Sequence, residues 1–186
     1  MKLECSLDLL EERHLPLMLE WRNSDRVRKN MLNDKIITFD EHQNWFKRMS
    51  QTGTNYYFIF SINEKPTGVV CFYDIDHPNM ISNWGAYIGD ANAPKGSGTA
   101  MGYLGLSYAF ETLKIRKISS ERLATNTIST KYTNKFGAKE EGVFKKHLLR
   151  DGVYIDIIRI GLFREDWLKQ KDTLKETLMA QGFHFN

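Results

Sequence analysis

A loop of small residues near the middle of the 186-residue chain carries the clearest chemical signal. It reads Lys95-Gly96-Ser97-Gly98-Thr99-Ala100, and it joins a strand-like run at residues 84–88 to an apolar segment with helical periodicity. Glycines let the backbone turn with positive φ, and the first N–H groups of a helix have no partners within the helix. Such N–H groups, at the positive end of the helix dipole, suit a pyrophosphate. The loop therefore predicts an anion site.

The pattern on either side predicts the elements that would position this loop. Residues 101–113 are apolar enough to form a largely buried helix, and residues 115–123 follow as a strand. Strand, helix and strand in this order predict a parallel crossover. The loop would then lie at the carboxyl end of the first strand, which is where ligands bind in such sheets.

The rest of the chain predicts strands and helices before and after the crossover. Before it come a strand, three helical pieces and a three-stranded meander, at residues 2–9, 15–23, 25–31, 39–49, 56–62, 67–73 and 81–88. Thr38 or Asp40 can cap the third helical piece. After it come a helix that ends at Gly137, a hairpin with the turn Arg150-Asp151-Gly152, and a terminal helix, at residues 127–136, 139–149, 154–163 and 167–179.

The composition limits the class of protein and the class of ligand. The length suits one domain, residues 1–186, and a hydrophobic fraction of 41% is typical of a globular chain. A net charge of +3, with basic residues spread among acids, requires no nucleic acid, and an anionic small ligand is enough. The chain has no apolar run of membrane-spanning length and no signal-peptide core at residues 1–8, so we expect a cytoplasmic protein without a membrane partner.

The cysteines and histidines show no pattern of a disulfide framework or a metal site. Cys5 and Cys71 both lie in apolar strand-like runs, where a buried free thiol is usual. Cys71 has no adjacent base, which indicates a core residue and not a nucleophile. Four histidines have no partner at metal-ligand spacing: His14, His77, His147 and His184. We therefore expect no metal.

Two linked motifs resemble the GNAT acetyltransferase superfamily, whose members move an acetyl group from acetyl-CoA to an amine. The glycine loop, residues 95–100, resembles the family's Gln/Arg-x-x-Gly-x-Gly/Ala, with lysine in the first position. Asn126-x-x-Ser129 and Lys135-Phe136-Gly137-Ala138 resemble the family's Asn-x-x-Ser and Lys-Leu-Gly-Phe at matching spacing. Two motifs at the right distance from each other are far more specific than either alone.

This resemblance implies a fold and a cosubstrate. The fold is α+β, with a central mixed, mostly antiparallel seven-stranded sheet and helices on both faces. The cosubstrate is acetyl-CoA, held by the glycine loop with Asn126 and Ser129. It also implies that backbone N–H groups of Tyr87, Ile88 and Gly89 polarise the thioester carbonyl, as in an oxyanion site.

Further matches are similar to a narrower group within the superfamily, the N-acetyltransferases of pseudaminic acid synthesis. These act on the 4-amine of a UDP-linked amino sugar on the way to glycosylated flagellin. The matching pieces are Trp21-Arg22-Asn23, Val27-Arg28, His42-x-x-Trp45, Gly85-x-Tyr87, Glu140-Glu141-Gly142 and Asp151-Gly152-x-Tyr154-x-Asp156. The ribosomal-protein N-terminal acetyltransferases share much of this pattern, so a peptide amine stays open as the acceptor. A non-catalytic acetyl-CoA-binding module is a third reading.

The narrower resemblance implies that Arg22, His42 and Tyr87 surround the nucleotide and the sugar. Arg22 could pair with a diphosphate, His42 could donate to a phosphate, and Tyr87 could cover a ring. Each residue also has a purely structural alternative. Arg22 could pair with a neighbouring acid, His42 could face solvent on its helix, and Tyr87 could fill the core.

At the position of the acid that protonates the leaving thiolate, this chain differs from the family pattern. Many members carry a tyrosine four residues before the motif glycine, where this chain has Thr133, and Tyr132 stands one residue earlier. One residue along a helix is a rotation of about 100°. For this acid we rank Tyr132 first, Ser129 second and Thr133 third.

The attacking amine must lose its proton, and Glu121 on the strand after the crossover helix could accept it directly or through water. Alternatively, Glu121 pairs with Arg122 or Lys117 at a solvated edge. We expect direct transfer in a ternary complex, because alignment of thioester and amine removes much of the barrier. The terminal hairpin and helix could also form a homodimer.

Overall fold

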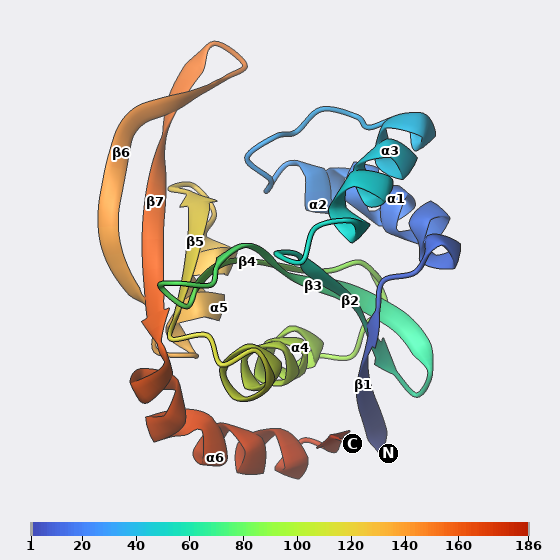
Figure 1. Cartoon of the computed structure of the whole chain (residues 1–186), viewed down its shortest axis with the longest axis vertical. Helices are drawn as coiled ribbons and strands as arrows, with labels where there is room; N and C mark the ends of the chain where they lie inside the picture. The colour runs from blue at the N-terminus through green and yellow to red at the C-terminus, as the bar shows by residue number, and fades with distance from the viewer. Residues whose placement is uncertain (1, 186) are drawn as a thin grey trace.

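The computed structural model describes residues 2–185, which form a mixed sheet of eight strands with helices on both faces (Figure 1). The strands are β1 (Leu3–Leu9), β2 (Tyr56–Ile62), β3 (Lys65–Asp76), β4 (Ile81–Ile88), β5 (Lys117–Leu123), β6 (Lys139–Arg150), β7 (Val153–Phe163) and β8 (Phe183–Phe185). The helical elements are η1 (Glu12–His14), α1 (Leu15–Asn23), α2 (Asp25–Arg28), α3 (Phe39–Ser50), α4 (Ser97–Ser107), the π-helical turn η2 (Tyr108–Thr112), α5 (Thr127–Asn134) and α6 (Arg164–Ala180). No helix in this part of the chain is long and apolar enough to cross a bilayer.

The strand order of the sheet is β6-β7-β5-β4-β3-β2-β1-β8. Within residues 2–185, two neighbouring pairs run parallel, β4 with β5 and β1 with β8, and the other five run antiparallel. The sequence predicts seven strands, and this number is wrong. The additional strand is β8, which pairs with β1 from Leu3 opposite Phe183 to Cys5 opposite Phe185. Three residues are too few for an alternating pattern to indicate a strand.

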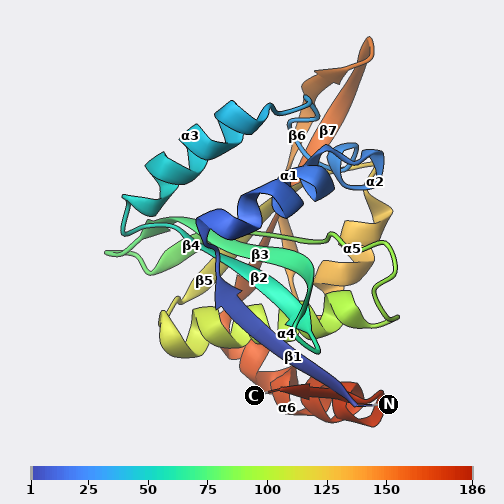
Figure 2. The same cartoon turned by 90° about the vertical axis from the view of Figure 1, so that its right-hand side faces the viewer.

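Two hydrophobic clusters fill the two faces of the sheet. Strand alternation divides them, because successive side chains of a strand point to opposite faces. Phe58 and Phe60 of β2 belong to the larger cluster, which packs against α4 and α6, whereas Ile59 belongs to the smaller cluster under α1 and α3. Figure 2 shows α4 and α6 on one side of the sheet and α1 and α3 on the other. The site lies on the side of α1 and α3.

The parallel crossover from β4 through α4 to β5 is confirmed, and its two strands separate early. They pair only from Ile81 opposite Lys117 to Asn83 opposite Ser119. Beyond these pairs β4 continues to Ile88 and β5 to Leu123 without pairing to each other. The sheet is therefore split between its two central strands at their carboxyl ends, next to the glycine loop.

A capping box fixes the start of α3 and thereby the position of His42 in its first turn. Thr38, and not Asp40, is the cap: Glu41 N donates to Thr38 Oγ1 (3.3 Å), and Thr38 N donates to Glu41 Oε2 (2.7 Å). This reciprocal pair satisfies two of the N–H groups that a helix start leaves open. His42 consequently faces the sheet and is 4% exposed.

Candidate active site

A cavity of about 740 Å³ lies between the split in the sheet and the layer formed by α1, α3 and the segment after α2. We call it the acceptor cavity. Its lining includes all six residues whose side chains the sequence assigns to the acceptor or to catalysis: Arg22, His42, Tyr87, Glu121, Ser129 and Tyr132. They come from five different elements, α1, α3, β4, β5 and α5. The fold thus brings together residues that are far apart in the chain.

Six residues of this lining carry a buried polar atom without a hydrogen-bond partner within residues 2–185: Arg22 Nη1, His42 Nε2, Trp84 Nε1, Tyr87 Oη, Arg122 Nε and Tyr132 Oη. Buried polar atoms in proteins almost always have a partner, so several unpartnered atoms on residues that line one cavity indicate a polar ligand. Burial lowers the pKa of Arg22, and burial followed by the nearby Arg22 cation lowers the pKa of His42. Burial raises the pKa of the Tyr87 phenol.

The structural alternatives for Arg22 and His42 do not describe what the structure shows. Arg22 donates through Nη2 to Asn33 O and not to an acid. His42 is buried and stacks on Trp45 with ring centroids 5.1 Å apart, so the solvent-facing alternative is wrong. Tyr87 packs against the smaller cluster, as its structural alternative has it, and it also lines the cavity, with its hydroxyl buried and without a partner within residues 2–185.

Tyr132 has the properties of a neutral proton donor. Its hydroxyl is buried and has no partner within residues 2–185, and burial raises the pKa of the phenol. Its ring packs against Trp84 and Phe136, with centroids 5.8 and 5.0 Å away. The hydroxyl lies over Gly102 of α4, where a Cβ would approach it to 2.6 Å.

Two other residues that the sequence assigns to this part of the site, Thr133 and Asn126, are engaged in hydrogen bonds. Thr133 Oγ1 donates to Ser129 O one turn earlier (3.0 Å), which removes it as an acid. Asn126 Oδ1 caps α5 by accepting from Ser129 N (2.9 Å). The Asn-x-x-Ser motif is therefore a helix cap in this structure, and only the Nδ2 group of Asn126 is left for acetyl-CoA.

Glu121 lines the cavity from β5 and pairs across the sheet with Arg159 of β7, with Oε1 3.1 Å from Nη1. The partners that the sequence predicts for it are wrong. Arg122 pairs instead with Glu140 (2.7 Å), and Lys117 pairs with Glu141 (2.6 Å). Glu121 keeps access to the cavity beside its partner.

The glycine loop lies at the start of α4, outside the lining of the acceptor cavity. Gly96 caps the helix with φ 101°, and the first helical hydrogen bond runs from Ala100 N to Gly96 O (3.0 Å). The N–H groups of Gly98 and Thr99 precede that bond and are open to a phosphate. A Cβ on Gly98 would lie 3.8 Å from Ile88 and 3.9 Å from Tyr132. The loop thus adjoins the cavity at Tyr132.

The remaining side chains of the loop contribute less than the sequence predicts. Ser97 is buried, its N–H and its hydroxyl both donate to Pro94 O (3.1 and 2.6 Å), and neither is free for a ligand. Thr99 Oγ1 accepts from Lys135 Nζ (3.3 Å), and Lys95 is exposed beside the helix start. Ala100 is fully buried.

At the end of β4, one of the three backbone N–H groups predicted to polarise the thioester carbonyl is left without an interstrand hydrogen bond. Gly89 N donates to Thr67 O (2.9 Å), so Gly89 N–H is engaged with β3. Because successive N–H groups of a strand point to opposite sides, Tyr87 N–H also points to β3 and Ile88 N–H points into the split. Arg26 donates to Ile88 O (3.1 Å) and to Gly89 O, which fixes this strand end.

Several lining residues were not predicted as site residues. Residues 30–33 carry no motif and lie in an irregular segment, so no pattern marks them. Arg48 stands three residues after Trp45 on α3, and helical spacing from Trp45 could have indicated it. Cys71 also lines the cavity and is not simply a core residue. Burial raises the pKa of its thiol to about 12, which leaves it without nucleophilic thiolate at neutral pH.

A split sheet beside the open N–H groups of a helix start, with a cavity behind it, is an arrangement that suits an acyl-transferring enzyme, which must align a nucleotide thioester with a nucleophile. Residues 6–139 match the family model described as Acetyltransferase (GNAT) domain. The chain belongs to the GNAT acetyltransferase family, and it is an acetyl-CoA-dependent N-acetyltransferase. Its residues 2–185 contain no cluster of three or more His, Cys, Asp or Glu that could hold a metal ion.

Two curated proteins show sequence similarity to this chain. It is 29% identical over 111 residues to the acetyltransferase PseH of Campylobacter jejuni. The aligned residues cover 60% of this chain and 68% of that protein. It is 25% identical over 104 residues to the putative ribosomal N-acetyltransferase YdaF of Bacillus subtilis, covering 56% of this chain and 57% of that protein.

Solved structures share the fold. The spermidine N-acetyltransferase of Vibrio cholerae, determined in complex with CoA and spermine, superposes with a TM-score of 0.82 at 19% identity and covers 88% of this chain and 98% of its own. A mutant form of the spermidine/spermine N-acetyltransferase of the same organism superposes with a TM-score of 0.75 at 18% identity, covering 89% and 98%. At these identities the likeness concerns the fold alone.

Proposed function

We propose that this enzyme acetylates the 4-amino group of a UDP-linked amino sugar, as a step of pseudaminic acid synthesis for flagellin glycosylation. One observation carries the proposal: Arg22 Nη1, His42 Nε2 and Tyr87 Oη are buried, are unpartnered within residues 2–185, and belong to residues that line one cavity. A nucleoside diphosphate sugar supplies phosphate and hydroxyl oxygens for such groups. The cavity volume of about 740 Å³ lies in the usual range of small-ligand sites. The similarity to PseH supports the same acceptor.

The charges of the acceptor cavity favour an anionic acceptor over a polyamine. Three arginines line it, Arg22, Arg48 and Arg122, of which Arg122 is paired with Glu140, and the lining carboxylates are those of Glu41 and Glu121. Both carboxylates are engaged, because Glu41 caps α3 and Glu121 pairs with Arg159. A polyamine carries several ammonium groups that need free carboxylates. This balance separates the proposed acceptor from the spermidine acetyltransferases that share the fold.

The geometry supports direct transfer in a ternary complex. Gly98 and Thr99 N–H groups hold the diphosphate of acetyl-CoA, and Ile88 N–H stabilises the oxyanion that forms on the thioester carbonyl. The amine nitrogen bonds to the acetyl carbon, Glu121 takes the amine proton directly or through water, and the C–S bond breaks. Tyr132 gives its proton to the departing thiolate, with Ser129 or water as the alternative donor.

Thiol release measured on three acceptors tests the proposal. Purified protein with acetyl-CoA should release coenzyme A on a UDP-4-amino sugar and not on spermidine or on a ribosomal N-terminal peptide. Turnover of the peptide alone would replace the sugar by a protein N-terminus, which the similarity to YdaF makes the second candidate. Calorimetric binding of acetyl-CoA without turnover of any amine would indicate a non-catalytic module.

We also infer a homodimer through the free edge of β6. This strand ends the sheet, and it exposes Val143 and Phe144. A second copy docked on this edge would bury both side chains and cover the unpaired backbone groups of the strand. Light scattering should give twice the mass of the chain, and Val143→Lys should halve it. A monomeric wild-type protein would contradict the inference.

A further inference from the structure

The segment that joins α2 to α3, residues 29–38, forms one wall of the acceptor cavity without a hydrophobic anchor. Residues 30–33 line the cavity, yet residues 29–38 have no regular secondary structure and include no buried side chain. A segment that buries no side chain opens readily unless polar contacts hold it. Those contacts therefore decide the shape of this wall.

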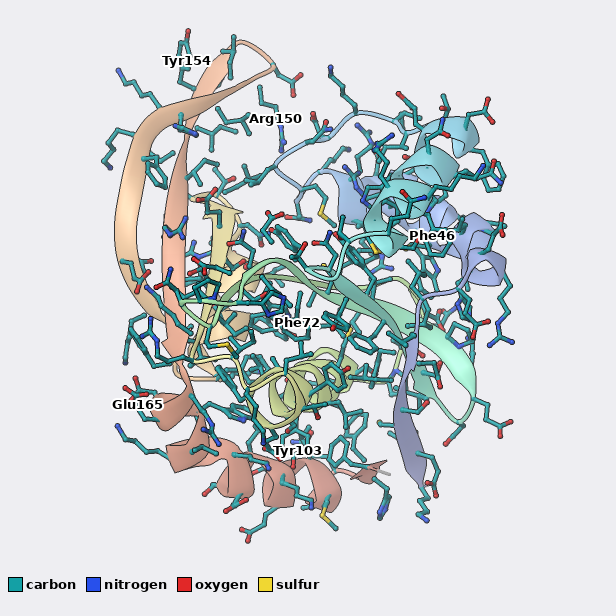
Figure 3. All side chains as sticks on the ribbon, viewed as in Figure 1. Phe46, Phe72, Tyr103, Arg150, Tyr154 and Glu165 are labelled. Atoms are coloured by element: carbon teal, nitrogen blue, oxygen red, sulfur yellow. The ribbon has the colours of Figure 1, made fainter. Side chains whose placement is uncertain are left out.

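Arg150, at the end of β6, provides four of them from the far hairpin. Its Nη1 donates to Lys29 O (3.0 Å), and its Nη2 donates to Met31 O (2.7 Å) and Leu32 O (3.1 Å). Its Nε pairs with the carboxylate of Asp34 at 3.2 Å. The side chain is only 13% exposed, although it stands beside a hairpin turn. Figure 3 shows Arg150 between the β6–β7 hairpin and the segment after α2.

Two further arginines hold the same segment from its own side. Arg22 Nη2 donates to Asn33 O, and Arg28 Nη1 donates to Asp34 O (2.8 Å). The Arg22 guanidinium therefore has one nitrogen on the wall, and its other terminal nitrogen, Nη1, is buried beside the cavity without a partner among the described residues. A shift of the wall would turn this guanidinium and move the group that faces the acceptor. Arg150 thus acts on the acceptor through the wall and through Arg22.

We propose that Arg150 is a positioning residue for the acceptor: it holds residues 29–34 against the β6–β7 hairpin and so sets the wall of the cavity and the orientation of Arg22. The proposal rests on the proposed function only in taking this cavity as the acceptor site. Lysine cannot replace it fully, since an ammonium group lacks the planar fork that reaches three carbonyls and a carboxylate together.

Steady-state kinetics and hydrogen exchange on R150A, R150K and K145A test this role. Lys145 is the matched control, because its ion pair with Asp156 (2.9 Å) stays within the hairpin. R150A should raise the KM for the amine acceptor about tenfold or more and leave the KM for acetyl-CoA within about twofold, since a small misplacement of binding groups costs this much. Amide exchange in residues 29–34 should accelerate without any ligand. R150K should fall between wild type and R150A, and K145A should match wild type.

Three results would overturn the role of Arg150: an unchanged acceptor KM in R150A, an equal rise of both KM values, or unchanged exchange in residues 29–34. Should R150A fail to fold, D34N removes one of the four contacts and should give a smaller change of the same kind. If the wild-type enzyme accepts no UDP-amino sugar, the proposed function fails separately. The exchange measurement and the KM for the amine that is accepted would then still decide the role of Arg150.

Discussion

Replacing Tyr132 by phenylalanine separates a catalytic hydroxyl from a structural one. The ring contacts with Trp84 and Phe136 remain, and only the hydroxyl is lost. Because this hydroxyl is buried without a partner within residues 2–185, its desolvation costs about 1–3 kcal/mol in the folded state. Y132F should therefore be more stable by about 1 kcal/mol, which is a rise in Tm of about 2–4 °C for a chain of this size.

The same variant should lose activity if the phenol protonates the thiolate. General acid catalysis contributes about 10²- to 10⁴-fold, so kcat should fall by about two orders of magnitude or more, with little change in the KM for acetyl-CoA. Thermal unfolding and thiol release on one preparation give both numbers. Y154F is the control, since Tyr154 is 61% exposed on the hairpin, and it should change neither.

Two outcomes would refute the reasoning about Tyr132. An unchanged kcat in Y132F would pass the acid role to Ser129 or to water. A lower Tm would mean that the hydroxyl has a partner in solution, such as a bound water, and that its burial is not a cost. A higher Tm together with a much lower kcat would show that the enzyme retains a destabilising group for its chemistry.

Three further variants test the loop, the histidine and the cysteine. Gly98→Ala should leave Tm unchanged, because its Cβ would lie 3.8 Å from the nearest atom of the free protein, and it should weaken acetyl-CoA binding. Gly96→Ala should lower Tm, because Gly96 has φ 101° and its Cβ would lie 2.8 Å from Phe183. A normal acetyl-CoA affinity in Gly98→Ala would remove the loop from the site. Burial lowers the pKa of His42, so its neutral form stabilises the folded protein fully above pH about 6.5, and this stabilisation is lost as the pH falls because the unfolded chain takes up the proton first. In H42Q the free energy of unfolding should fall less steeply with decreasing pH. Identical pH dependences of the unfolding free energy in H42Q and wild type would contradict the burial effect. Cys71→Ala should keep kcat within about threefold, since a thiol with a pKa of about 12 forms no acyl intermediate at neutral pH, and an inactive variant would revive the covalent route.

Local chemistry explains which parts of the fold could be predicted from the sequence. The glycine loop, the meander and the Thr38 cap depend on residues within a few positions of each other, and the structure has all three. The eighth strand could not be predicted, because β8 forms only where α6 returns the chain beside β1. The pairing of Glu121 with Arg159 follows from the β5–β7 register, which the sequence does not reveal.

The candidate site was predictable where a motif marks it and unpredictable where distant contacts build it. Arg22, His42 and Tyr87 were placed by resemblance, and in the structure all three line one cavity. The burial of His42 depends on the angle at which α3 meets the sheet, so its helical position alone left a solvent-facing alternative open. Arg150 contacts a segment more than a hundred positions away, and no local pattern links the two.

The early separation of β4 from β5 has a consequence for how this enzyme can diverge. The proposed mechanism uses the N–H group of Ile88, which lies beyond the paired part of β4 and β5, so part of the proposed chemistry would belong to the main chain and to no side chain. Replacement of the neighbouring side chains can then retune which amine enters while the group facing the thioester stays in place. A scaffold of this kind allows acceptor preference to drift under selection without rebuilding the reaction centre.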